Sequence, residues 1–387
     1  MIEQTPKWIF NLLFFLMISS SFVLVEPSPY DFLMLMIVCY GLFFSQVSFP
    51  QKVFIPLITM LLFLIFQFIS LLFANEAHGS LAYFAITTYL MVSWLVIVGI
   101  GQRLKISLLQ VVMNGYLISA VLSAVIGILA YFLLIPYSDL FLMFGRAKAF
   151  FKDPNVFGPF LIMPALYAFS LFEMEQISKF KKVVHAFSFI LLLTGIFVSF
   201  SRAAWGSFAI SCMIYFLLTK RELIHKRIKT SISLGIVSIP LLVWLAQSPF
   251  VVELFQSRLS MQGYDESRFE TQKEAFLTGL TNPFGIGPGQ SESTFQIAPH
   301  SLYARIITEN GILSIILFIF FLLLSIHRAY QSYKQSIGQS AIYFLLICAS
   351  LIGLTFNSMF IDTLHWRHFW LLLALAWCAP LKRGDDG

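Results

Sequence analysis

Charged side chains are scarce in this chain. Asp, Glu, Lys and Arg make up 11% of its 387 residues, whereas hydrophobic residues make up 58%. Soluble domains carry about 25% charged residues, so a water-soluble fold could not bury this much apolar surface. The apolar runs are continuous and do not alternate, which excludes a membrane β-barrel. The composition therefore predicts an all-α polytopic membrane protein.

Cysteine is also rare, and the four residues are Cys39, Cys212, Cys348 and Cys378. Each lies in an apolar run and none forms a CxxC pair, so we expect free thiols inside the membrane. His365 and His368 are close in sequence, but no carboxylate or cysteine completes a reliable metal-ligand spacing. We therefore expect no metal and no cofactor.

Apolar runs that are long enough to cross about 30 Å of hydrocarbon recur along the chain. They predict about twelve transmembrane helices in a single transmembrane domain, residues 1–387. The expected spans are residues 8–25, 30–47, 53–74, 80–101, 106–136, 155–172, 183–200, 203–219, 230–246, 302–326, 340–358 and 368–380. With both termini in the cytoplasm, most of the 25 Lys and Arg residues lie in short cytoplasmic loops, as the positive-inside rule requires.

Two long loops fall on the opposite, extracytoplasmic side: residues 137–154 and residues 247–301. Within the larger loop, Ser267-Arg268-Phe269-Glu270 has the form of a capping box, and apolar residues that follow share one helical face. We expect a short amphipathic helix over about 267–280 that lies along the membrane surface. Asn282-Pro283 should end it.

Arginine recurs on this outer side, where topology normally keeps positive charge low. Arg202 and Arg305 lie against spans, and Arg146 and Arg268 lie in the two loops. A guanidinium group fits phosphate and pyrophosphate geometry well. Any one of these arginines could instead extend toward lipid headgroups or pair with a nearby acid. As a set, they favour an anionic ligand.

Other polar residues of the outer side allow both a functional and a structural interpretation. His300 precedes a helix that enters the membrane, so its imidazole could accept a proton from a hydroxyl or simply bond nearby backbone. Arg305 and Glu309 are four residues apart and can pair on one helical face. Asp153 and Asn155 begin a span, where they could cap the helix or face a substrate.

The Gly/Pro-rich turn over residues 282–289 lies between these groups. Gly287 and Gly289 permit a close approach of the backbone to a ligand. No GKS or GKT sequence follows, so the turn does not indicate nucleotide binding.

Four short motifs keep a common order along the chain. They are Phe151 to Gly158 with Asp-Pro-Asn-Val-Phe-Gly, then Ser201-Arg202-Ala203-Ala204-Trp205, then Arg268 followed by Asn282-Pro283-Phe284-Gly285-Ile286-Gly287, and finally Pro299-His300-Ser301-Leu302-Tyr303 with Glu309-Asn310-Gly311. Together they resemble the O-antigen ligase/polymerase superfamily (Wzy_C type). The resemblance covers the chain from about Arg146 to Gly311, and the number of spans extends it to the whole.

This resemblance implies a GT-C-like fold and a metal-independent glycosyltransferase of the cytoplasmic (inner) membrane. Such an enzyme takes a glycan from undecaprenyl pyrophosphate and attaches it to an acceptor hydroxyl on the outer side, as a surface polysaccharide polymerase or an O-antigen ligase. Attack opposite the pyrophosphate would invert the anomeric centre. The acceptor would be a glycan, a lipid or a wall polymer, in contact with membrane lipids and without any nucleic acid.

The resemblance also implies roles for individual residues. His300 would be the catalytic base, and Arg202 and Arg268 would hold the pyrophosphate. We expect Arg305 to join them, with Arg146, Asp153, Asn155 and Glu309 as possible supporting residues.

Three other functions stay open at this point. A transporter or flippase of lipid-linked sugars would need a polar pathway near the bilayer midplane, often with broken helices. A non-catalytic scaffold would explain the apolar bulk but not the outer arginines. A membrane acyltransferase could also use His300, although no acid stands at a supporting spacing.

Overall fold

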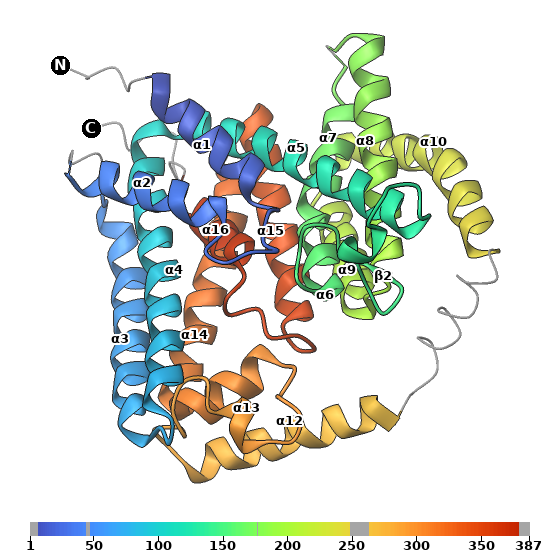
Figure 1. The fold of residues 1–387 in the computed structure, drawn as a ribbon. Helices are drawn as coiled ribbons and strands as arrows, with labels where there is room; N and C mark the ends of the chain where they lie inside the picture. Colours follow the sequence, from blue (N-terminus) through green and yellow to red (C-terminus); the bar gives the residue numbers. More distant parts are fainter. Residues whose placement is uncertain (1–6, 44–46, 176, 248–262, 379–387) are drawn as a thin grey trace. The chain divides into compact units, whose positions relative to one another are not determined.

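The computed structural model describes residues 7–43, 47–175, 177–247 and 263–378, and these are mostly helical (Figure 1). Contacts divide the chain into two compact units, each built from segments that are far apart in the sequence. Unit 1 comprises Met1–Ile37, Ile106–Ser260 and Ser336–Gly353, and unit 2 comprises Val38–Lys105, Met261–Gln335 and Leu354–Gly387. The expectation of a single transmembrane domain stays a prediction.

Unit 1 contains most of α2 and α15, which continue into unit 2, and several complete elements. Its elements are α1 (Lys7–Ser19), α2 (Pro29–Phe43), α5 (Ile106–Tyr131), η3 (Ser138–Phe141), β1 (Leu142–Met143), β2 (Arg146–Ala147), α6 (Pro154–Phe160), α7 (Ile162–Phe172), α8 (Lys179–Val198), α9 (Arg202–Leu217), α10 (Arg221–Ala246) and α15 (Gly338–Asn357). The strands β1 and β2 pair antiparallel. Phe144 and Gly145 between them both have positive φ, which suits a tight hairpin.

Unit 2 is built around the long helices α3, α4 and α14, with α12 crossing their end (Figure 1). Its elements are η1 (Gln51–Val53), α3 (Phe54–Ser70), η2 (Leu71–Phe73), α4 (Ala77–Leu104), α12 (Gly263–Thr281), α13 (Ser291–Thr294), α14 (Leu302–Gln335) and α16 (Arg367–Leu375). Aromatic side chains join these helices: Trp94 of α4 meets Phe321 of α14 edge-on, with ring centroids 5.3 Å apart.

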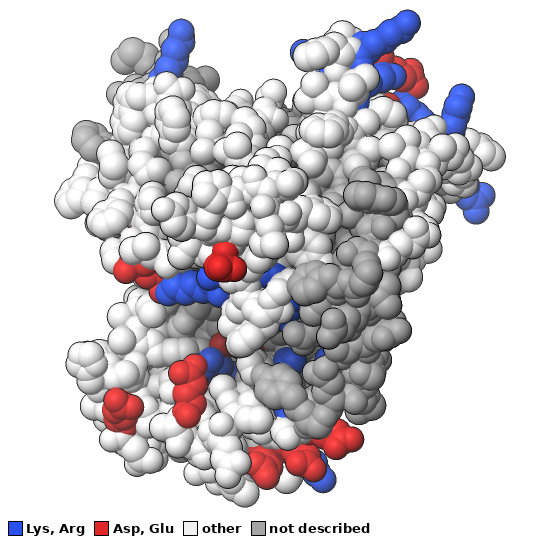
Figure 2. Space-filling model, turned by 45° about the vertical axis from the view of Figure 1, so that its right-hand side comes forward, with Lys and Arg blue, Asp and Glu red and all other residues white. Residues whose placement is uncertain are grey.

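The helix α3 shows an arrangement that suits lipid as the surrounding solvent. Ile58, Ile65 and Phe68 form an exposed apolar stripe along one side of it. The opposite side buries polar groups such as Gln67, whose amide donates to the Thr87 hydroxyl at 3.3 Å. Charged side chains gather in a few groups on the face shown in Figure 2, and most of that face is uncharged. An apolar exterior over a partly polar interior is typical of helices in a bilayer.

The prediction of an all-α polytopic membrane protein is confirmed. Within the described ranges, seven helical segments are long and apolar enough to cross a membrane: Gln51–Phe73, Ala77–Leu104, Ile106–Tyr131, Pro154–Phe172, Lys179–Val198, Leu302–Gln335 and Gly338–Asn357. The apolar helices α1, α2 and α9 are shorter. A helix occupies every position where a span was expected, but the number of twelve crossings stays a prediction.

The helix α12 covers the range 267–280 in which a short helix was expected. It ends at Thr281, directly before Asn282-Pro283, as predicted. The expected capping box is wrong, because Ser267 lies inside the helix and its carbonyl accepts from the Thr271 hydroxyl. Residues 248–262 of the expected loop 247–301 lie outside the described residues. The position of α12 along a membrane surface stays a prediction.

One side of α12 is anchored on α14. The Thr308 hydroxyl donates to the Ala275 carbonyl at 2.6 Å, and a Cβ atom at Gly279 would lie 2.7 Å from the Ile307 carbonyl oxygen. Small residues therefore allow the two backbones to touch. The other side of α12 exposes Phe269 and Leu280.

Candidate functional site

The helix α14 is interrupted at Gly311, whose φ of 86° and ψ of 177° are not helical. The turn over residues 282–289 fills this interruption. The backbone N–H groups of Ile286 and Gly287 donate to the carbonyls of Thr308 and Glu309 at 2.9 and 3.0 Å. These bonds satisfy carbonyl groups that a continuous helix would have bonded internally. The Gly/Pro-rich turn therefore docks on the chain's own backbone.

The glycines of this turn are needed for that close approach. Gly285 has a φ of +80°, and a Cβ atom there would lie 2.2 Å from the Glu309 carbonyl oxygen. A Cβ atom at Gly311 would lie 2.1 Å from the Pro283 carbonyl oxygen. The approach of a ligand was expected at Gly287 and Gly289 and stays a prediction. In the structure a Cβ atom at Gly287 would lie 2.6 Å from Ala74 Cβ, and one at Gly289 would lie 3.3 Å from Tyr83 Cβ.

Behind the turn, the Glu309 carboxylate is fully buried. It accepts from the backbone N–H of Gly289 at 2.8 Å, from that of Ser291 at 3.3 Å, and from Arg305 Nε at 2.9 Å. The predicted pairing of Arg305 with Glu309 is thus confirmed. Three donors compensate for the removal of this charge from water.

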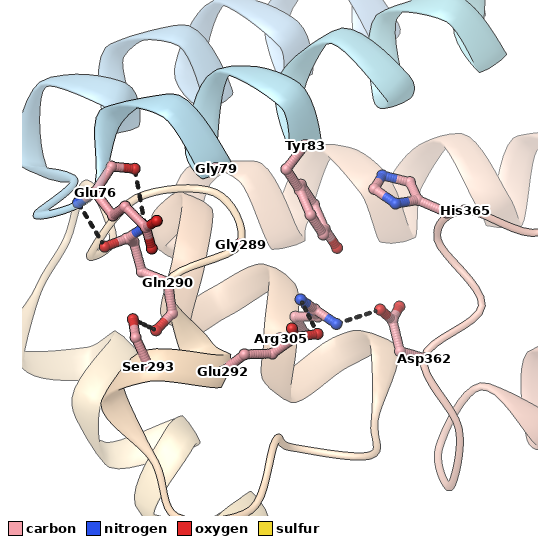
Figure 3. Close-up of a pocket in the computed structure, with 10 residues that line it drawn as sticks. All are labelled: Glu76, Gly79, Tyr83, Gly289, Gln290, Glu292, Ser293, Arg305, Asp362 and His365. Atoms are coloured by element: carbon pink, nitrogen blue, oxygen red, sulfur yellow. Dashed lines mark hydrogen bonds and ion pairs between the residues drawn. The ribbon is translucent and has the colours of Figure 1, made fainter. Parts of the chain in front are cut away.

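Arg305 is itself nearly buried, at 8% exposure, and meets two further carboxylates. Its Nη1 lies 2.9 Å from Asp362 and its Nη2 lies 3.2 Å from Glu292. The guanidinium carbon also lies 4.8 Å from the centre of the Tyr83 ring. Figure 3 shows the group held between these side chains. Its expected contact with pyrophosphate stays a prediction, and an incoming anion would meet these carboxylates.

The buried pair leads to a prediction about stability. Glu309→Gln should lower the free energy of unfolding by about 3–5 kcal/mol, because it leaves the Arg305 charge with less compensation in a buried place. The apparent melting temperature of the purified protein in detergent measures this effect. Glu292→Gln is the matched control, since the Glu292 side chain is 67% exposed and its ion pair should contribute at most about 1 kcal/mol. Equal melting temperatures for both variants would contradict the prediction.

A pocket of about 510 Å³ lies beside this network within unit 2 (Figure 3). Its lining includes Glu76, Tyr83, Gln290, Glu292, Arg305 and Asp362. Gln290 forms a rigid part of the wall, because its amide bonds both backbone groups of Glu76 and the Ser80 hydroxyl. Of these six residues, only Arg305 was predicted from the sequence. The others come from segments that are far apart in the sequence, and no short motif connects them.

His300 lies two residues before the start of α14, and hydrogen bonds hold the chain on both sides of it. Its carbonyl accepts from the Gln272 amide at 3.1 Å, and the N–H of Leu302 donates to the Ser358 carbonyl at 3.0 Å. Ser301 accepts from the Ala304 N–H and thereby caps the helix, which begins where the sequence predicted. The side chain of His300 is half-buried.

Arg268 lies on α12, four residues before Gln272. Side chains four residues apart share a helical face, so Arg268 and the contact between Gln272 and His300 lie on the same side of α12. Arg268 Nη2 donates to the Phe360 carbonyl at 2.7 Å. His300 and Arg268, two of the expected site residues, thus lie on segments that contact each other in unit 2.

Unit 1 holds the remaining expected residues. Arg146 is 7% exposed, and its guanidinium donates to the Ser199 carbonyl at 2.9 Å and to the Asn155 side chain at 2.8 Å. Asp153 accepts from the Asn155 N–H at 2.7 Å and caps α6, which confirms its expected structural role. Arg146 thus fixes the turn that leads into α9, where Arg202 is the first residue and is exposed.

A metal site is not found among the described residues, because no group of three or more His, Cys, Asp or Glu side chains there could hold a metal ion. The four cysteines are free thiols, as predicted.

Residues 187–319 match the family model Wzy_C, O-Antigen ligase. The matched family is the one that the motifs resembled. It contains Arg202, Arg268, His300, Arg305 and Glu309, and it begins after Arg146, Asp153 and Asn155. No curated protein matches the chain. The Wzy_C match supports a role like that of an O-antigen ligase or polymerase, and so a glycosyltransferase-like enzyme in a membrane.

Proposed function

We propose that this protein transfers a glycan from undecaprenyl pyrophosphate to an acceptor hydroxyl on the outer side of the cytoplasmic membrane. It would act as a surface polysaccharide polymerase or as an O-antigen ligase, with both termini in the cytoplasm. The observation that carries the proposal is the Wzy_C match, because one matched segment contains His300, Arg202 and Arg268.

The chemistry requires a base and a place for negative charge. His300 accepts the proton of the acceptor hydroxyl as its oxygen attacks the anomeric carbon of the donor sugar. The bond from that carbon to the pyrophosphate oxygen breaks, and undecaprenyl pyrophosphate leaves with the electron pair. Attack from the opposite side inverts the anomeric centre, and no step requires a metal ion. The fixed backbone around His300 supports this role, because a base must be held within reach of its proton.

The arginines stabilise the leaving group in this proposal. Negative charge grows on the pyrophosphate in the transition state, and a guanidinium can meet it with two parallel hydrogen bonds. The exposed Arg202 at the start of α9 suits this role. Arg268 suits it as well, because it lies on α12 four residues before Gln272, whose amide donates to the His300 carbonyl.

Arg202→Ala and Arg268→Ala are each expected to reduce the transfer rate by about 10²–10³-fold, the usual effect of removing one such donor. Arg→Lys at either position should recover part of the rate. It restores the positive charge but not the two parallel N–H donors of a guanidinium group. Transfer is measured with purified protein, a synthetic undecaprenyl-pyrophosphate glycan and candidate acceptors, with products weighed by mass spectrometry. Arg221→Ala, at an exposed position of α10, is the control. Unchanged rates in both Ala variants would refute the pyrophosphate contact.

A transporter or flippase of lipid-linked sugars is the second candidate, and the interruption of α14 is the observation that favours it. In such proteins the interrupted backbone usually lines the substrate pathway. Here residues 283–287 occupy the interruption and bond its backbone groups, and the Ser70 hydroxyl also donates to the Glu309 carbonyl. Because the chain itself fills the interruption, glycan transfer is favoured over transport. Movement of substrate across liposomes without formation of a glycosidic bond would reverse the choice.

A further inference from the structure

We propose that the pocket beside Arg305, here named the acidic pocket, binds a sugar ring that is uncharged or carries an amino group. The same pocket should reject sugars that carry a carboxylate. Its place in a glycan-transfer reaction rests on the proposed function, whereas its selectivity for charge does not.

The balance of charge is the main argument. The lining contains three carboxylates, Glu76, Glu292 and Asp362, and the Glu309 carboxylate lies directly behind Arg305. Arg305 is the only Lys or Arg among the described residues of the lining. An anion in this pocket would meet more negative than positive charge at short range. A uronic acid or a pyrophosphate is therefore disfavoured there, so this proposal replaces the predicted contact of Arg305 with pyrophosphate.

The hydrogen-bonding groups point to a ligand that donates many bonds. Three of the five N–H groups of Arg305 donate to Glu292, Glu309 and Asp362. The Gln290 amide bonds the Glu76 backbone and the Ser80 hydroxyl. Among the described residues, no hydrogen bond or ion pair joins the carboxylate of Glu76, which remains able to accept.

Several hydroxyl groups on one ring are such donors. A hydroxyl that donates to a carboxylate makes a charge-assisted hydrogen bond, which is stronger than a neutral one. The volume of about 510 Å³ lies within the usual range for small-molecule sites.

Tyr83 provides an independent sign that the acidic pocket takes a ligand. Its hydroxyl is buried and makes no hydrogen bond to any described residue. Figure 3 shows this side chain extending from α4 toward Arg305, into the space between the lining groups. Its ring is fixed by His365, with centroids 4.1 Å apart, and His365 in turn contacts the Thr87 hydroxyl at 3.0 Å. A buried hydroxyl without a partner is unfavourable, so a polar ligand in this place gains a prepared partner.

The sugar ring could belong to the transferred glycan or to the acceptor, because both present the same chemistry. Binding of simple probes tests the chemistry first. Methyl glucoside, methyl glucosaminide and methyl glucuronide are offered to the purified protein at neutral pH, and saturation-transfer NMR measures their binding. We expect the first two to bind and the glucuronide to bind at least about tenfold more weakly. The reason is the repulsion between its carboxylate and the carboxylates of the pocket.

Glu292→Lys is the decisive variant, because this side chain is 67% exposed and its replacement should leave the fold intact. It should reduce the preference for the glucosaminide over the glucuronide by about tenfold or more. Glu266→Lys makes the same change at an exposed position of α12 outside the pocket and should leave the preference unchanged. The assignment would be overturned if all three glycosides bound equally, or if Glu292→Lys left the preference unchanged. It would also be overturned if ethanolamine, which has no ring, bound as well as the glycosides.

Transfer assays then identify the source of the ring. If Glu292→Lys raises KM for the lipid-linked donor alone, the pocket holds the transferred glycan, and if it raises KM for the acceptor alone, the pocket holds the acceptor. The wild-type protein could bind the glycosides with the expected selectivity and still transfer no glycan. This result would refute the proposed function but not the sugar site. A protein that transfers glycan with unaltered KM values in Glu292→Lys would refute the site alone.

Discussion

His300→Ala is expected to reduce glycan transfer by about 10²–10⁴-fold, the usual contribution of a general base. An acceptor hydroxyl has a high pKa, so without a base its oxygen attacks slowly even when the pyrophosphate is well bound. The backbone anchors of His300 do not involve its side chain: Gln272 bonds its carbonyl, and Leu302 bonds Ser358. The variant should therefore fold and enter the membrane normally. Single-turnover transfer from a lipid-linked glycan gives the rate.

His327→Ala is the matched control, because His327 lies on the same helix, α14, and is exposed. It should transfer glycan at the rate of the unaltered protein. The melting temperature and the elution profile of both variants show whether either has lost its fold. Full activity of a correctly folded His300→Ala protein would show that His300 is not the catalytic base.

Gly285→Ala and Gly311→Ala should have the largest effects on folding. The new Cβ atoms would lie 2.2 and 2.1 Å from carbonyl oxygens of the opposing segment, and both residues have positive φ. Backbone cannot move aside as the end of a flexible side chain can, so the turn would leave the interruption of α14. The loss of several hydrogen bonds together with strain should exceed about 4 kcal/mol, at the extreme of single substitutions. The yield of monodisperse protein after detergent extraction measures the effect.

Gly235→Ala is the control for these variants. It lies within α10, and the nearest side-chain atom to its added Cβ would be Ile239 Cδ1 at 3.6 Å. Alanine favours a helix over glycine by roughly 1 kcal/mol, so this variant should be as stable as the unaltered protein or slightly more so. Normal yields of Gly285→Ala and Gly311→Ala would show that the turn does not dock as described.

The helices were largely predictable, because long apolar runs have few alternatives in a bilayer. Their ends were less predictable. The run expected to span 106–136 is helical only to Tyr131, and α12 begins before Ser267. The sequence Ser267-Arg268-Phe269-Glu270 satisfies a capping rule, but the residues directly before it are helical as well.

Local pairs within the candidate site were also predictable. Arg305 with Glu309 and Asp153 with Asn155 are both separated by a few residues, so helix geometry alone brings them together. Glu76 and Asp362 could not be connected to Arg305 in this way, since only the tertiary packing of unit 2 places them at one pocket. The glycine in Glu309-Asn310-Gly311 is compatible with an interruption of the helix. Nothing in the sequence indicates that residues 283–287 fill this interruption.

The docked turn has a consequence for the rate of the reaction. The helical segment from Leu302 to Asn310 cannot slide along its axis or rotate, because the N–H groups of Ile286, Gly287 and Gly289 would all lose their acceptors at once. In the proposed mechanism the backbone that carries His300 is therefore preorganised, and little backbone entropy is lost there as the reactants meet. For the proposed transfer we therefore expect release of the lipid product, and not rearrangement of this segment, to limit turnover.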